Sequence, residues 1–174
     1  MNNMETEKIS AGKFSINYGV ILGLVMVVIS VLTYVTGLAI QGAQWPTVIY
    51  YLVFPIVIFY AIHQYKKRNG NLLGLGDAIK VGVVIGVISA LVFVIYSLIF
   101  NYIIDPEFIN QMMAAAKDKM IEDNPEMTQE MIDQGMKFIE MFANPGLMGA
   151  FWVAMSAIFG LIYALIGGLI MKKE

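Results

Sequence analysis

Methionines that could bind a soft metal gather in one part of the chain. Eight of the thirteen methionines fall between Met112 and Met148. Thioether sulfur suits cuprous copper, so this clustering raises the hypothesis of a copper site. However, the methionines recur mostly where an amphipathic helix needs an apolar face, and methionine is an adaptable packing residue on such faces. The pattern therefore favours packing over metal binding.

Carboxylates crowd the middle of the same region. They are Asp118, Glu122, Asp123, Glu126, Glu130 and Asp133. Their oxygens attract hard cations such as calcium, but the pattern of a calcium-binding loop with its required glycine is absent from the sequence. The single histidine, His63, stands beside a basic turn, and the sequence contains no cysteine that could complete a ligand set. We predict neither a metal site nor a cofactor.

No catalytic motif accompanies these groups. The sequence contains no nucleophile elbow, no phosphate-binding glycine loop and no zinc-binding helix. Its apolar runs lack acidic and basic side chains, which are the usual components of proton relays and ion paths inside membranes. A strongly basic face for nucleic acid is also missing, and the net charge is −2. We therefore predict a non-enzymatic protein that does not bind nucleic acid.

Long apolar runs determine the elements that carry these residues. The sequence is 59% hydrophobic and 14% charged, whereas soluble domains are nearer half apolar and a quarter charged. Uncharged runs longer than about 18 residues indicate membrane spans. We expect an all-α polytopic membrane protein with four transmembrane helices, at about 16–40, 46–63, 78–104 and 145–171.

The remaining segments follow from these spans. An N-terminal segment, 1–15, precedes the first three helices, which lie within 16–104. An acidic, Met-rich segment, 105–144, comes before the fourth helix and the C-terminus, 145–174. The acidic segment is too polar to cross a membrane.

The distribution of basic residues predicts an orientation. Eight of the eleven basic residues flank ends of spans that would share one side of the membrane: Lys8, Lys13, Lys66, Lys67, Arg68, Lys80, Lys172 and Lys173. The other three share the segment 105–144 with nine acidic residues, which gives that segment a net charge of −6. Because basic loops stay in the cytoplasm, we expect both termini there and the acidic segment outside.

Small residues recur at four-residue spacing on three of the expected helices. They are Gly19 and Gly23, Gly82 and Gly86, and Gly160, Ala164 and Gly168. Helices in lipid associate through close backbone packing at such residues. We interpret these stripes as contacts between helices rather than as the lining of a pore.

The segment 105–144 has the pattern of two amphipathic helices that form a hairpin. Asp105 followed by Pro106 predicts a capped start for the first helix, and Thr128 can cap the second. The apolar positions define a candidate interaction face: Phe108, Met112, Met113, Met120, Ile132, Met136 and Ile139. The two helices could fold on each other, lie on the membrane or present a groove.

Several segments together resemble a known family. They are the glycine-rich first helix, the basic turn followed by the residues 74–78, the segment 96–106, the Met-rich acidic loop and the run 159–166. This pattern resembles a family of small bacterial four-span membrane proteins catalogued only as a domain of unknown function. The resemblance covers nearly the whole chain, and Asp105-Pro106 is its most specific element. It implies a location in the bacterial inner membrane and supplies no activity or catalytic residue.

The sequence is compatible with two functional hypotheses. The leading hypothesis is a non-enzymatic structural or interaction protein that presents the external hairpin to membrane lipid or to a membrane or periplasmic protein partner. The alternative is a small transporter or permeation subunit that assembles as a homo-oligomer through the glycine stripes. A membrane enzyme is the least favoured reading because no catalytic constellation is present.

Overall fold

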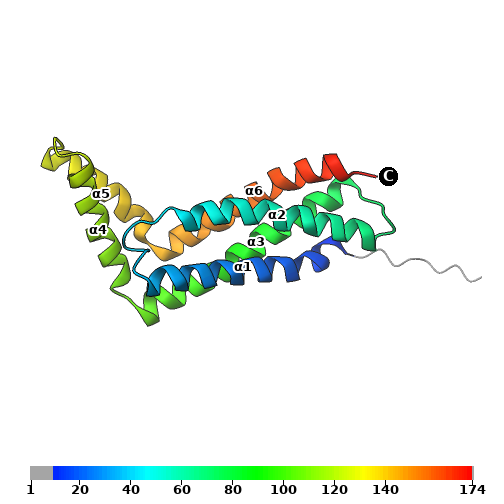
Figure 1. Ribbon diagram of the computed structural model, residues 1–174, viewed down its shortest axis with the longest axis horizontal. Coiled ribbons are helices and arrows are strands. Elements are labelled where there is room, and N and C mark those ends of the chain that lie inside the picture. The colour runs from blue at the N-terminus through cyan, green and yellow to red at the C-terminus, as the bar shows by residue number, and fades with distance from the viewer. Residues whose placement is uncertain (1–9, 174) are drawn as a thin grey trace, which may run out of the picture.

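The computed structural model describes residues 10–173, which form a bundle of long helices with a smaller helical pair at one end (Figure 1). The long helices are α1 (Ala11–Val35), α2 (Trp45–Arg68), α3 (Leu75–Ile99) and α6 (Pro145–Met171). A short π-helix, η1 (Phe100–Ile104), extends α3, and the smaller pair consists of α4 (Phe108–Asp123) and α5 (Gln129–Ala143). In the described residues the predicted all-α architecture is confirmed.

Four helices are long and apolar enough to cross a membrane. They are α1, α2, α3 together with η1, and α6. At about 1.5 Å per residue, each can cover roughly 30 Å of hydrocarbon. The expected number of long apolar helices is therefore confirmed, and the chain has the character of a multi-pass membrane protein.

The first helix lies earlier in the sequence than the predicted range 16–40. Its N-cap is Ser10, whose Oγ accepts from the backbone N–H of Lys13 at 3.5 Å, so the helix begins before the apolar run does. It ends at Val35 because Gly37 adopts a left-handed conformation with φ of 71°, which glycine tolerates without a steric penalty. The part of the predicted segment 1–15 that contains Lys8 lies outside the described residues.

The second helix continues beyond the predicted end at His63 and includes the basic residues up to Arg68. Lysine and arginine are good helix formers, and their charges interact favourably with a helix C-terminus. The helix ends only before Gly70, which has a φ of 64°. The basic turn expected here is thus largely the last turn of α2.

The end of α3 widens into η1. The Asp105 N–H donates to the Phe100 carbonyl oxygen at 2.9 Å, which closes a turn one residue wider than an α-helical turn. Pro106 follows, and a proline disfavours helical geometry in the residue before it. The segment therefore leaves the bundle at Asp105, as the sequence predicts.

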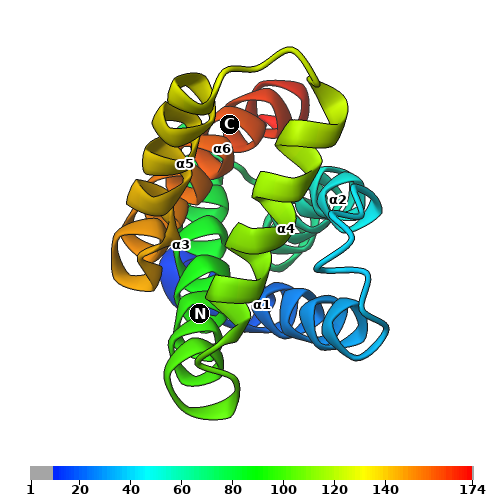
Figure 2. The ribbon, with the colours of Figure 1, turned by 90° about the vertical axis from the view of Figure 1, so that its left-hand side faces the viewer.

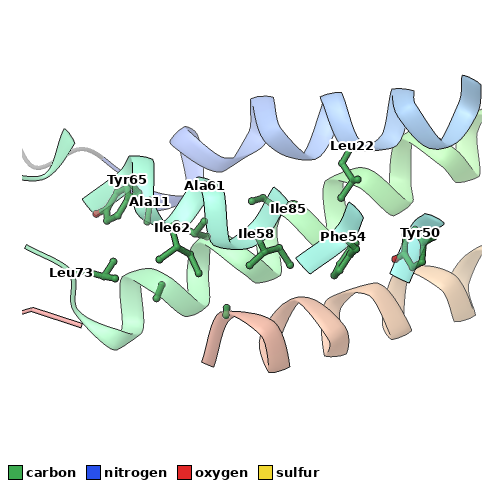
Figure 3. Packing of buried hydrophobic residues seen from close by; sticks show 13 residues of the cluster. Ala11, Leu22, Tyr50, Phe54, Ile58, Ala61, Ile62, Tyr65, Leu73 and Ile85 are labelled. Atoms are coloured by element: carbon green, nitrogen blue, oxygen red, sulfur yellow. The ribbon is translucent and has the colours of Figure 1, made fainter. Parts of the chain in front are cut away.

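Helix α3 occupies the centre of the bundle and packs mainly on α6 and α1. Helix α2 contributes most of the large core side chains. Ile58, Ala61, Ile62 and Tyr65 recur on one stripe, are fully buried and point into the bundle (Figure 3). This stripe fixes which face of α2 turns inward.

Basic residues from the start of α1, from the α2–α3 turn and from the C-terminus meet at one end of the bundle, called here the basic end. Leu73 and Lys173 exchange two backbone hydrogen bonds of 2.8 and 3.2 Å, which ties the α2–α3 turn to the C-terminus. Lys66 Nζ donates to the Met171 carbonyl oxygen at 2.7 Å, and the Arg68 guanidinium lies 5.4 Å from the ring centre of Phe14 on α1. The α4–α5 pair lies at the opposite end (Figure 1).

Candidate functional site

The predicted glycine stripes lie where the helices of the bundle approach most closely. A Cβ added to Gly82 would overlap the Cβ of Ala164 and the carbonyl oxygen of Gly160, and one added to Gly86 would overlap the Ser156 carbonyl oxygen. These contacts join α3 to α6. Gly168 continues them, because a Cβ there would lie 2.9 Å from the Cβ of Ala78.

The same kind of contact joins α1 to α3. A Cβ on Gly19 would lie 2.7 Å from the Cβ of Ile88, and one on Gly23 would lie 2.6 Å from the Cβ of Val92. The small residues of α1, α3 and α6 are therefore covered by helices of the same chain. These residues contribute to helix packing within the bundle.

The α4–α5 pair crosses the end of the bundle, with α5 on the side of α6 (Figure 2). Within the pair, a Cβ on Gly135 would lie 2.9 Å from Met120 Cε, so the two helices pack closely there. Ile132 is buried, and Met136 is half-buried. Thr128 caps α5, as predicted, by accepting from the Met131 N–H at 3.4 Å.

The rest of the predicted interaction face lies over a cavity of about 460 Å³ between the pair and the bundle, called here the hairpin cavity. Phe108, Met112, Met113 and Ile139 line it, together with parts of α3 and α6. The predicted face is thus turned toward the bundle and toward the partner helix. An isolated sequence could not reveal this, because an apolar face has the same pattern whether it covers a protein or meets a lipid.

The hairpin cavity is mainly apolar. Its polar lining includes Ser97 and Asn101, and these two already satisfy each other: Asn101 Nδ2 donates to the Ser97 carbonyl oxygen at 2.7 Å and to Ser97 Oγ at 3.2 Å. The volume falls in the range of about 300–1,000 Å³ that is usual for ligand pockets. A hydrocarbon chain matches such a lining.

A second apolar surface extends from the rim of this cavity along the exposed side of α5, since Phe138 and Phe142 also line the cavity. Phe138, Met141 and Met131 are exposed there, and Phe138 is 62% exposed. The Phe138 and Phe142 rings are 5.1 Å apart between centroids, and Phe142 and Phe151 are 6.2 Å apart. We call Phe138, Phe142 and Phe151 the aromatic edge.

The aromatic edge runs from α5 onto α6. Phe151 and Leu147 are both exposed on α6, a helix that is long and apolar enough to cross a membrane. The sequence pattern indicated only the inward face as a candidate site and did not indicate this edge. The signal for it was present in the wide apolar arc of α5, which is too broad to be buried by one neighbouring helix.

Asp105 has a different role from the predicted one. It was expected to cap α4, but its carboxylate accepts a hydrogen bond from the Tyr34 hydroxyl at 3.0 Å. Helix α4 begins after Glu107 without a side-chain cap, because the turn at 106–107 carries the chain away from Asp105 first. Asp105 therefore fastens the start of the pair to the end of α1.

The acidic side chains crowd the far tip of the pair and face solvent. Asp118, Glu122, Asp123, Glu126 and Glu130 are all exposed. Across residues 10–173, the structure brings no three His, Cys, Asp or Glu side chains close enough to hold a metal ion. The structure therefore offers surfaces and cavities to apolar molecules, and the acidic side chains at the tip of the pair lie apart from them.

Comparison with known proteins gives one match. A family model described as "Protein of unknown function (DUF4199)" matches residues 17–173. The matched range includes most of α1 and every later helix. No curated protein and no solved structure matches the chain.

Proposed function

The chain belongs to the family described as protein of unknown function (DUF4199), and from this premise we propose a non-enzymatic membrane protein whose α4–α5 hairpin lies on the outer surface of the membrane and contacts lipid. The bundle is the anchor, and the hairpin is the functional part. The hairpin contacts the hydrocarbon of neighbouring lipids rather than a soluble protein. No cofactor takes part in this function.

The aromatic edge is the observation that carries the proposal. Phe138 and Phe151 are about half or more exposed, and burying a phenylalanine in an apolar environment stabilises it by about 1.5–3 kcal/mol. In water that stabilisation would be lost. Because the edge continues onto the lipid-facing side of α6, the same membrane that surrounds the bundle can cover it.

The hairpin cavity supports lipid as the occupant. Its apolar lining comes from both the pair and the bundle, and it lies at the end of the long helices, where we propose that acyl chains meet headgroups. The acidic tip points away from this apolar surface and remains hydrated. Together these features describe a hairpin with one side in the membrane interface and its tip outside it.

Charge supports the orientation that we propose. The basic end gathers lysines and an arginine from three separate regions, and the hairpin carries a net charge of −6. By the positive-inside rule, the basic end with both termini lies in the cytoplasm and the hairpin on the opposite side. We propose the bacterial inner membrane as the location.

The proposal is tested by measuring whether lipid reaches the aromatic edge. In a protein with both native tryptophans replaced by phenylalanine, Phe138→Trp places a single tryptophan on the edge. In liposomes of phosphatidylcholine with brominated acyl chains, we expect strong quenching of this tryptophan. The matched control is Ile121→Trp in the same background, since Ile121 is also exposed but lies near the acidic tip.

We expect the Ile121→Trp fluorescence to change little in brominated lipid. Quenching of neither tryptophan would mean that the hairpin stands clear of the bilayer, and the lipid proposal would then be rejected. A protein partner, or the homo-oligomeric transporter considered from the sequence, would be the next hypotheses to test.

A further inference from the structure

A second cavity, of about 210 Å³, lies inside the bundle where all four long helices meet, and we call it the inner cavity. Thr33 of α1, Tyr50 of α2, Ser89 of α3 and Ser156 of α6 are among its lining residues. Figure 3 shows Tyr50 at the end of the core nearest the start of α6. The proposed hairpin function does not use this space.

Buried hydroxyl groups are concentrated around the inner cavity. In residues 10–173 the buried polar or charged side chains are Ser15, Thr33, Ser89 and Ser156, and all but Ser15 line this cavity. Burying a hydroxyl among apolar residues has a free-energy cost unless it forms hydrogen bonds. Each of the three that line the cavity has a hydrogen-bond partner within the protein, and together they keep further hydrogen-bonding capacity that a bound molecule with a polar group can use.

Two of these hydroxyls use their hydrogens on the backbone of their own helix. Thr33 Oγ1 lies 2.8 Å from the Ser30 carbonyl oxygen, and Ser89 Oγ donates to the Gly86 carbonyl oxygen at 3.0 Å. Their oxygen lone pairs remain as acceptors.

The Tyr50 and Ser156 hydroxyls differ, because they pair with each other at 3.2 Å across α2 and α6. That pair contains two O–H groups and one hydrogen bond between them. Whichever hydroxyl accepts therefore keeps a hydrogen that it can donate to a ligand.

The other lining residues indicate which kind of molecule fits the cavity. None of the residues that line the cavity carries a charge, so a neutral molecule fits best. Aromatic rings form part of the wall, with the Tyr50 and Trp152 centroids 6.3 Å apart in an edge-to-face arrangement. An engineered cavity of about 150 Å³ binds benzene, so the inner cavity has room for a ring that carries a small polar substituent.

We propose that the inner cavity binds a small neutral aromatic molecule of the phenol class. The ring lies against the aromatic wall, and its hydroxyl exchanges hydrogen bonds with the Tyr50–Ser156 pair. Phe93 and Trp152 line both the inner cavity and the hairpin cavity, so they stand between the two and mark the route of access. This site goes beyond the proposed contact of the hairpin with lipid and does not depend on it.

Tryptophan fluorescence can report on this site directly. The sequence contains two tryptophans, so Trp45→Phe leaves Trp152 as the sole tryptophan of the full chain. We expect 4-bromophenol, whose bromine quenches tryptophan at close range, to quench Trp152 with a saturable component. The matched control has both native tryptophans replaced by phenylalanine and carries Tyr60→Trp, because Tyr60 is 54% exposed on α2 and does not line the cavity, so it reports partitioning into lipid or detergent. It should show only a linear response, and linear quenching of both proteins would overturn the proposal.

The hydroxyl pair supplies the specific test. Combining Tyr50→Phe with Ser156→Ala in the Trp152 reporter should raise the Kd for 4-bromophenol about three- to tenfold, the range expected for one lost hydrogen bond. Bromobenzene has no hydroxyl and should bind both forms equally. An unchanged Kd for 4-bromophenol, or an equal loss for both probes, would overturn the proposal.

Ser15→Ala is the control for removal of a buried hydroxyl elsewhere. Ser15 is fully buried near the basic end, where its Oγ donates to the Ala11 carbonyl oxygen at 2.7 Å. This variant should bind 4-bromophenol like the reporter, and weakened binding would count against a local site. If the double variant does not fold, as judged by circular dichroism, the milder pair Tyr50→Phe with Ser156→Cys serves, because a thiol is only a weak hydrogen-bond donor, and the same direction of change is expected.

Discussion

The hydrogen bond from the Tyr34 hydroxyl to the Asp105 carboxylate joins two residues 71 positions apart in the sequence. The Tyr34 ring also packs edge-to-face on Phe100 and Phe108, with centroid distances of 4.8 and 5.5 Å. One side chain of α1 therefore holds both the end of α3 and the start of α4. At the scale of single residues, this contact determines how firmly the hairpin is attached.

Replacing Tyr34 with phenylalanine should loosen the hairpin without unfolding the bundle. The Tyr34→Phe variant keeps the ring contacts and loses only the bond to Asp105. We expect faster hydrogen–deuterium exchange in the first turns of α4 and unchanged exchange in α2. Tyr102→Phe is the control, because Tyr102 is 61% exposed at the same end of the bundle. Equal exchange in both variants would show that the bond does not restrain the hairpin.

A methyl group added at Gly86 should destabilise the protein. The new Cβ of Gly86→Ala would overlap the Ser156 carbonyl oxygen, which belongs to the backbone of α6 and cannot move aside cheaply. Overpacking of this kind costs about 1–3 kcal/mol. Thermal unfolding in detergent, followed by circular dichroism, should therefore show a lower Tm.

Gly76→Ala provides the comparison for that measurement. Gly76 also lies in α3, but a Cβ there meets nothing within 4 Å. Since alanine favours helix over glycine, this variant should be neutral or slightly more stable. If the Tm of the Gly86→Ala protein equalled that of the Gly76→Ala protein, the close contact between α3 and α6 would be wrong.

At the scale of elements, the number and length of the long helices could be predicted because apolar runs and their breaks are local properties. The spacing of Gly82, Gly86 and Gly160 also indicated close packing. What remained hidden was the direction of each face. A membrane helix is apolar all round, so the sequence does not show that Tyr50, Ser89 and Ser156 meet at one cavity.

For the hairpin, too, the sequence predicted the helices but not the direction in which their faces point. Its apolar periodicity predicted two amphipathic helices, and Thr128 marked the start of the second. The position of Phe108 and Ile139 over a cavity depends on how the pair meets α3 and α6, which is a tertiary property. The bond between Asp105 and Tyr34 depends on it as well, and it overrode the local capping preference of aspartate.

The polar face of α5 predicts a preference among lipids. Glu130, Asp133 and Glu140 outnumber Lys137 on this helix, so anionic headgroups should repel it. We expect weaker quenching of Phe138→Trp in brominated lipid that contains phosphatidylglycerol than in phosphatidylcholine alone, at low ionic strength. Because salt screens exposed charges, 0.5 M salt should remove most of the difference. A stronger contact with the anionic lipid would contradict this account of α5.

At the scale of the whole molecule, the bundle separates two chemically different ends. Backbone bonds between Leu73 and Lys173 close the basic end, and the α4–α5 pair covers the other (Figure 2). The two proposed apolar sites lie toward the hairpin end, where they share Phe93 and Trp152. The proposed contact of the hairpin with lipid on the outer surface assumes that the two ends face opposite sides of a membrane.

Cysteine labelling of the two ends tests this assumption most directly. The sequence contains no cysteine, so Leu72→Cys at the basic end and Asn124→Cys at the hairpin tip each introduce one reactive thiol at an exposed position. In intact bacterial cells whose inner membrane is accessible, a membrane-impermeant maleimide should label Asn124→Cys at once. It should label Leu72→Cys only after the membrane is permeabilised. Labelling of both thiols from the same side would contradict the four-span arrangement on which the account depends.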